Sequence, residues 1–505
     1  MNFCTSDEIA DIPDFLNERL KMKLNEKLKS FFEDEKKQNI VLLCCIAAIM
    51  LLWLPLAFTK NLAYDQGYTI AMVRHSFKDI IRLCSNDVHS PLYYFIAKIF
   101  YHVFFNHIFG TKICSLFFMV IYFWLLAFPF KKEFGFRMSI TMIILSGLLP
   151  TFLTHNTEPR MYAMAVTSFS TVCFLGYKLA KEFKVSLAIW FFIASVFSTY
   201  IHTYTMLCTV FIYLFLAIAI IIKKEDRKRK ITWFLVNAIV VSLCYLPWLF
   251  SLVSQFGKKA EGVNTEYDSL YFVKDILYEF FSSITYPKDW QVWLWLAIIF
   301  ISLVFLLVYK SPYKKYVSLT FIMFFAVSFI GIFLSVKNSP CFLGRYVSCI
   351  APLILFAIAA GLNEMKMKLL YVFIFLLAFV PGALVYRDRV RYEYEKGIDD
   401  YLSYAESTFT DDDAILYADL HNNYLSVYYD ENYSFIYGFE DDFNPFGNDE
   451  TLTEKEQLEK IKGNVYLICF DNKNPGWFLD CDYEKAYGFH FLYYDFSIYR
   501  IYNFR

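Results

Sequence analysis

The chain has 505 residues, of which 57% are apolar, 21% are aromatic and only 19% are charged. An average soluble chain is about 45–50% apolar and about 25% charged. The composition therefore excludes a disordered, collagen-like or disulfide-scaffold protein. The 48 Lys and Arg residues balance the 49 Asp and Glu residues, so nothing favours a nucleic-acid partner, which needs a basic surface.

The first segment, residues 1–38, is predicted to be a cytoplasmic amphipathic stretch. Apolar side chains such as Phe15, Leu20 and Leu24 recur at helical spacing, and lysines lie between them. A basic amphipathic helix of this kind lies on a membrane surface. The segment is too polar for a cleaved signal peptide.

Long apolar runs dominate the next 350 residues. A helix that crosses about 30 Å of hydrocarbon needs roughly 20 apolar residues, and about eleven runs reach or approach that length. They lie at 39–58, 112–130, 138–155, 161–180, 186–204, 206–222, 232–253, 291–310, 316–335, 346–362 and 368–386. We therefore predict an all-α polytopic membrane domain over residues 39–386, which binds membrane lipid.

The basic loops set the predicted orientation in the membrane, because short loops rich in Lys and Arg stay on the cytoplasmic side. Five such loops occur, at 131–137, 178–184, 223–230, 309–315 and 363–368. If all five are cytoplasmic, the apolar run at 91–109 does not cross completely and lies along the outer interface, inside an external loop at 59–111. Counting hydrophobic peaks alone would make this run a span. The prediction is a multi-pass plasma-membrane protein with a cytoplasmic N-terminus.

Residues 387–505 differ in character and are predicted to form a small extracytoplasmic α/β domain. Four runs have the aromatic and β-branched enrichment of strands, at 414–419, 424–430, 464–470 and 490–502. Residues 451–463 begin with Thr and end with Gly, as helices often do.

Five polar clusters share the predicted outer face, at 63–68, 86–94, 155–162, 198–205 and 338–346. Ionisable groups at membrane depth are costly and usually line a cavity or pathway. Each group has a structural alternative when taken alone, such as a solvated carboxylate, a helix cap, or an arginine that reaches the lipid headgroups. Their gathering on one face is what indicates a site. The candidates are Asp65, Gln66, Asp87, His89, Glu158, Arg160, Tyr162, His202, Arg345 and Tyr346.

The order of these clusters resembles the family 39-like GT-C glycosyltransferases, the group around protein O-mannosyltransferases and aminoarabinose transferases. The resemblance rests on Asp65 after the first span, on the Asp-Val-His-Ser-Pro-Leu-Tyr-Tyr motif at 87–94, and on the Glu-Pro-Arg-Met-Tyr motif at 158–162. It is good over residues 40–220. Gln66 stands where the family usually has a second acid, and Ser90 replaces the first of two prolines.

The resemblance implies a GT-C fold and a polyprenyl-phosphate sugar donor, undecaprenyl phosphate if the chain is bacterial. A hexose or pentose would be transferred with inversion to an extracytoplasmic acceptor, which is a cell-surface glycan, a lipid or a protein. A sugar hydroxyl is a poor nucleophile, so transfer needs a general base, and Asp65 is the candidate. Guanidinium groups suit phosphate, so Arg160 and Arg345 are expected to bind it, with Arg74 as a third candidate. The remaining candidates are expected to bind substrate.

Two further alternatives stay open. Asp87, His89 and Glu158 either hold a divalent metal ion or position the substrates through hydrogen bonds. No nucleotide cofactor is expected, because the chain has no Walker A or GxGxxG motif. The competing function classes are a transporter or flippase of lipid-linked sugars and an inactive lipid-binding membrane protein.

Overall fold

The structure is a computed structural model. It describes residues 34–87, 89–105, 107–222, 226–255, 268–283, 285–337, 342–417, 423–428, 433–436, 450–451, 458, 460–471, 481–492 and 494–503. The amphipathic helix predicted before residue 34 and most of the helix predicted at 451–463 lie outside these ranges.

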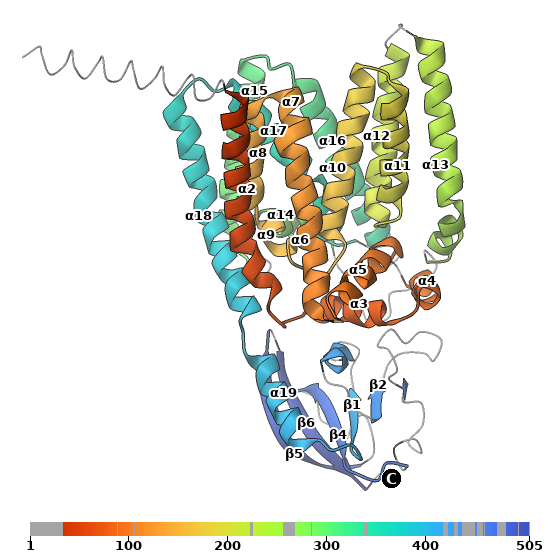
Figure 1. Ribbon diagram of the computed structural model, residues 1–505. Coiled ribbons are helices and arrows are strands. Elements are labelled where there is room, and N and C mark those ends of the chain that lie inside the picture. The colour runs from red at the N-terminus through yellow and green to blue at the C-terminus, as the bar shows by residue number, and fades with distance from the viewer. Residues whose placement is uncertain are drawn as a thin grey trace, which may run out of the picture.

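The membrane domain is a bundle of long apolar helices (Figure 1). Within the described residues, nine helices are long and apolar enough to cross a membrane, and α8 and α11 are shorter apolar helices. Each falls on one of the predicted runs. They are α2 Glu35–Ala57, α6 Ile108–Leu125 continued by η1 Leu126–Phe130 and α7 Lys131–Phe134, α8 Phe136–Leu148, α10 Tyr162–Lys181, α11 Val185–Thr199, α12 Thr203–Ile222, α13 Arg227–Gln255, α15 Asp289–Val308, α16 Lys314–Lys337, η2 Gly344–Ile350 continued by α17 Ala351–Glu364, and α18 Lys368–Glu393.

One predicted span is broken in two. The run at 138–155 forms α8 and then a short helix, α9 Pro150–His155, with Leu149 extended between them. Proline lacks the amide hydrogen that a continuing helix needs and favours the first helical position. The break at Pro150 turns the chain, so that His155 and the loop after it enter the site.

Three short helices, α3 Tyr64–Arg74, α4 Phe77–Asn86 and α5 Leu92–Val103, lie at the end of the bundle that faces the C-terminal domain (Figure 1). With 12 residues, α5 is about 18 Å long, which is too short to cross a bilayer. This agrees with the prediction that 91–109 is not a span. A fourth helix, α14 Ser269–Phe281, packs against η2.

The C-terminal domain is a mixed six-stranded sheet, counted over the described residues, with α19 Gly397–Thr408 packed on β5. Parallel pairs join β1 to β2 and β4, and β2 to β3, whereas β6 runs antiparallel to β4 and β5. The α/β prediction is confirmed. The sheet order is β3-β2-β1-β4-β6-β5, with β1 Ala414–Tyr417, β2 Tyr433–Ile436, β3 Glu450–Thr451, β4 Val465–Phe470, β5 Asp482–Phe491 and β6 Tyr494–Tyr502.

Two strand predictions are corrected by the structure. Where the structure describes it, the run at 424–430 is not a strand, because Asn423–Val427 forms the 3-10 helix η3. Residues 424–427 are all buried, and η3 packs on α3, so tertiary packing overrides the strand propensity of this run. The run at 490–502 is not one strand: it contains the end of β5 and the whole of β6, and the chain turns between them at Leu492 with φ 58°.

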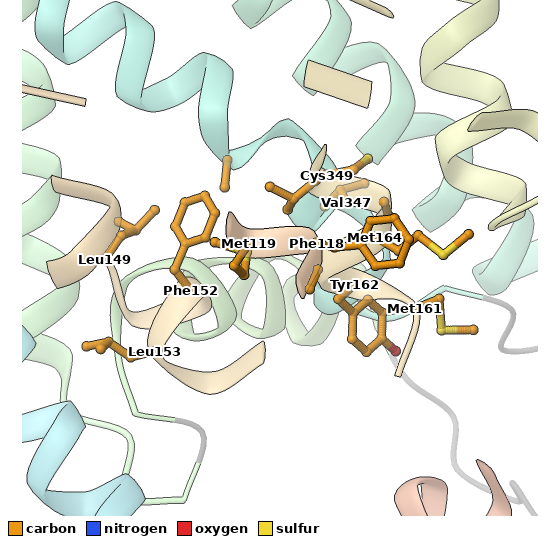
Figure 2. Close-up of a cluster of buried hydrophobic side chains, with 14 of the residues drawn as sticks. Phe118, Met119, Leu149, Phe152, Leu153, Met161, Tyr162, Met164, Val347 and Cys349 are labelled. Carbon is orange, nitrogen blue, oxygen red and sulfur yellow. The ribbon is translucent and has the colours of Figure 1, made fainter. Parts of the chain in front are cut away.

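The largest of three apolar clusters among the described residues extends from the membrane helices into the C-terminal domain. Figure 2 shows part of it, where side chains from α6, α9, α10 and η2 meet in one cluster that includes Met119, Phe152, Tyr162 and Val347. The Phe152 ring stacks on Tyr122 with centroids 5.6 Å apart. This packing supports the loop at 156–161, which carries part of the site.

Candidate active site

The Asp65 carboxylate forms an ion pair with the Arg345 guanidinium, although 280 residues separate them in the chain. Asp65 lies in the first turn of α3 and Arg345 in η2. Their side chains are 28% and 27% exposed, so the pair is accessible from outside the core. Burial by itself raises the pKa of the Asp65 carboxyl, but Arg345, then Arg160 and His89, outweigh it and hold this pKa below its usual range. Asp65 is therefore ionised at neutral pH.

Arg345 is placed by the close contact of η2 with α14. The Gly344 amide donates to the Asp275 carboxylate over 2.6 Å. A Cβ atom at Gly344 would lie 2.7 Å from the Asp275 carbonyl oxygen, so only glycine fits. The buried Arg345 Nε has no hydrogen-bond partner among the described residues, and one edge of the guanidinium is left for another acceptor.

A second group centres on Arg160, which is 2% exposed. Its Nη2 lies 2.8 Å from His89 Nε2, and its Nη1 donates to the Asp65 carbonyl oxygen over 3.1 Å. Because arginine only donates, a neutral His89 carries its proton on Nδ1, which lies 2.5 Å from Asp87 Oδ2. The Tyr68 hydroxyl donates to the same carboxylate oxygen over 2.8 Å. This group fixes the start of α3 and the chain ahead of α5.

A third group is a buried row of carboxylates and one imidazole. The Gln66 amide donates to Glu158 Oε1 over 3.2 Å. His155 lies between the two acids, bonded through Nδ1 to Glu158 and through Nε2 to Glu279 Oε1 at 2.5 Å. Burial lowers the pKa of His155, but Glu279 and Glu158 outweigh it and raise this pKa to about 9. Burial likewise raises the pKa of Glu158, but the His155 imidazolium outweighs it and holds this pKa at about 2.

This third group accounts for the departure at position 66. Because Glu158 stays ionised, a donating amide suits the neighbouring position, whereas a second carboxylate there would repel it. Gln66 is 2% exposed, so water would screen that repulsion weakly.

An aromatic group borders Arg345. The guanidinium carbon lies 6.0 Å from the ring centroids of Tyr162 and Tyr346, and the His202 ring lies 4.8 Å from Tyr346. Burial lowers the pKa of His202 well below its usual value, and the neighbouring His89, Arg160 and Arg345 add to this effect. His202 is therefore neutral and can hydrogen-bond an uncharged ligand.

The structure thus brings all ten predicted site residues to the end of the bundle that carries α3. They form three contact groups. These are Asp65 and Arg345 with Tyr162, Tyr346 and His202; Arg160 with His89 and Asp87; and Gln66 with Glu158.

Sequence reasoning missed two functional candidates, His155 and Glu279. His155 opens the polar cluster at 155–162 and could have been found as an ionisable residue ending an apolar run. Glu279 lies between Tyr278 and Phe280 of α14, and no sequence motif around it indicates a functional residue. The third phosphate candidate, Arg74, instead donates to the Val427 carbonyl oxygen of the C-terminal domain over 2.8 Å.

In the described part of the chain, no group of three or more His, Cys, Asp and Glu residues is placed to hold an ion, so Asp87, His89 and Glu158 are not gathered as three ligands. Asp87 and His89 form one pair, and Glu158 belongs to another with His155. The cationic Arg160 faces the remaining nitrogen of His89, which disfavours a second cation there. No step is therefore assigned to a metal.

A bundle of long apolar helices, with a charged site at the end that faces an α/β domain, is the architecture of a polytopic membrane protein. No protein-family model and no curated protein matches the chain. Among solved structures, ArnT from Cupriavidus metallidurans in the apo state aligns with a TM-score of 0.65 at 9% identity, over 90% of this chain and 97% of that chain. The same ArnT bound to undecaprenyl phosphate aligns with a TM-score of 0.62, at the same identity and coverage. The chain has the ArnT fold, which confirms the predicted fold class.

Proposed function

We propose that the chain is an integral-membrane glycosyltransferase that moves a sugar from a polyprenyl-phosphate donor to an acceptor outside the cytoplasm. One observation carries the proposal: the Asp65 carboxylate and the Arg345 guanidinium form an ion pair that is partly exposed. The ArnT fold supports it, because one solved ArnT structure holds undecaprenyl phosphate.

The chemistry follows from the two side chains. The Asp65 carboxylate takes the proton of the acceptor hydroxyl while the oxygen of that hydroxyl attacks the anomeric carbon of the donor sugar. The bond from that carbon to the phosphate oxygen breaks on the opposite face, so the configuration inverts and polyprenyl phosphate leaves with the electron pair. Arg345 stabilises the charge that develops on the phosphate. Turning Arg345 towards the phosphate would also weaken its hold on Asp65 and make the carboxylate a stronger base.

The other groups have supporting roles in this mechanism. Arg160 is bonded to His89 and to the Asp65 backbone, so we assign it to positioning α3 as well as to the local positive potential. The Tyr162 hydroxyl has no partner among the described residues. This hydroxyl and the neutral His202 are the groups available to sugar hydroxyls.

Sugar transfer by purified protein from a synthetic polyprenyl-phosphate sugar tests the proposal. Asp65→Asn is expected to remain folded and to lose transfer, whereas the matched control Asp79→Asn, an exposed carboxylate on α4, keeps it. Full activity of Asp65→Asn would remove this residue from the mechanism. Movement of the lipid-linked sugar across vesicles without transfer would favour a flippase, and lipid binding without either would favour an inactive protein.

A further inference from the structure

The chain segment that carries Asp65 is held by the C-terminal domain. The segment begins after α2 and includes α3, and its contacts with residues beyond 390 occur on both sides of Asp65. Ahead of α3, the Asn61 amide donates to the carbonyl oxygens of Tyr392, in the last turn of α18, and Glu395, which follows that helix, over 3.0 and 2.8 Å. At the other end of α3, Arg74 donates to the Val427 carbonyl oxygen over 2.8 Å.

The tightest contact lies between these two, where η3 packs on α3. A Cβ atom added at Gly67 would lie 2.6 Å from the Cβ of Tyr424, a distance that real Cβ atoms essentially never show. Tyr424 is 2% exposed, and its ring meets the Tyr64 ring edge-on with centroids 6.2 Å apart. The Tyr424 side chain of η3 therefore lies directly against the α3 backbone, with no room for a side chain at position 67.

Gly67 is two residues from Asp65 on the same helix, so a shift of α3 moves the carboxylate relative to Arg345, which lies on η2. We propose that η3 of the C-terminal domain sets the position of the Asp65 carboxylate, with Tyr424 as the positioning residue. This proposal rests on the proposed function. Under it, the C-terminal domain completes the active site rather than only covering it.

The contact is steric, and this allows a specific test. Gly67→Ala forces α3 and η3 apart. The kcat is expected to fall about tenfold or more, because a misplacement of about 1 Å can cost about 100-fold in rate, while donor binding stays within about twofold. Tyr424→Gly removes the one clashing Cβ, so the double variant Gly67→Ala/Tyr424→Gly should regain much of the kcat. Gly67→Ala/Tyr424→Ala keeps that Cβ and should not.

The pH profile separates positioning from general loss of structure. Asp65 faces Arg345 from η2, Arg160 from the loop at 156–161, and His89 ahead of α5. If α3 moves, the carboxylate loses part of this attraction, its pKa rises, and the acidic limb of the kcat profile moves to higher pH. A variant that only destabilised the fold would lower the amount of active protein and leave the limb in place.

Three further variants complete the experiment. Gly147→Ala is a matched glycine control away from the site, where the added Cβ meets side-chain atoms of Ile49 and no backbone, and it should keep the wild-type kcat. Arg74→Met removes the hydrogen bond from Arg74 to Val427 of η3 without adding a clash. It should also move the acidic limb of the kcat profile to higher pH. This variant tests the proposal if Gly67→Ala does not fold. If wild type lacks transfer, the proposed function fails. The positioning role is judged when wild type is active and Asp65→Asn is inactive. It is overturned if Gly67→Ala then keeps the wild-type kcat and pH profile. It is also overturned if both double variants recover the kcat equally.

Discussion

Replacing Gln66 with glutamate tests the buried charge row that links α3 to α14. The introduced carboxylate would lie where the Gln66 amide now donates to Glu158 over 3.2 Å. Two like charges about 4 Å apart repel by about 4 kcal/mol at an effective dielectric constant of about 20. Since about 1.4 kcal/mol corresponds to one pKa unit, the pKa of the new carboxyl should rise by about three, from about 4.3 to roughly 7.

The sign of the effect on stability follows from this raised pKa. Below about pH 4.3 the new carboxyl is protonated in both the folded and the unfolded chain, so it costs little. As the pH rises towards 7, the unfolded chain releases the proton but the folded chain holds it, and the free energy of unfolding falls by up to about 4 kcal/mol. The loss stays near that value at higher pH.

Thermal unfolding of the purified variant between pH 5 and pH 8 measures this effect. Gln66→Glu should melt below wild type at pH 8 and approach it at pH 5. Gln66→Met removes the same hydrogen bond without adding charge, so its loss of stability should not depend on pH in this range. A Gln66→Glu variant as stable as wild type at pH 8, or one whose deficit is the same at both pH values, would refute the account of the charge row.

Three other predictions concern separate parts of the chain. Arg345→Ala should weaken donor binding by about 10- to 100-fold, because a charge-assisted hydrogen bond is worth about 1.5–3 kcal/mol; a donor titration unchanged from wild type would exclude its phosphate role. Lys112→Met should destabilise the fold by about 3–5 kcal/mol, since Lys112 Nζ lies 2.7 Å from Glu393 with both side chains fully buried; an unaltered melting temperature would contradict this. A cysteine at His107 should react with an impermeant thiol reagent in intact cells, and reaction only after permeabilisation would reverse the predicted orientation.

The membrane architecture could be predicted from the sequence because the bilayer imposes a length. Every spanning helix must cover about 30 Å with apolar residues, so runs such as 291–310 and 316–335 are visible without any tertiary information. The five basic loops gave a self-consistent orientation. With all five loops on one side of the membrane, the run at 91–109 cannot be a complete span. The 12-residue α5 agrees with it.

Local patterns were less reliable where packing competes with propensity. The run at 424–430 has the composition of a strand, yet η3 forms there and packs on α3, with the Tyr424 side chain against Gly67. The same contact is what places the C-terminal domain on the candidate catalytic helix. A contact between segments more than 350 residues apart leaves no mark in the composition of either one.

The sequence by itself determined the spans, the clustering of polar residues on one face, and the residue types of the candidate site. Only the tertiary structure decided the partners: Arg345 for Asp65, His89 for Arg160, and the row of Gln66, Glu158, His155 and Glu279. The physical reason is that hydrophobic spacing reports which segments leave water, whereas ion pairs and hydrogen bonds depend on distances of about 3 Å. Those distances are fixed by how the helices pack and not by their order in the chain.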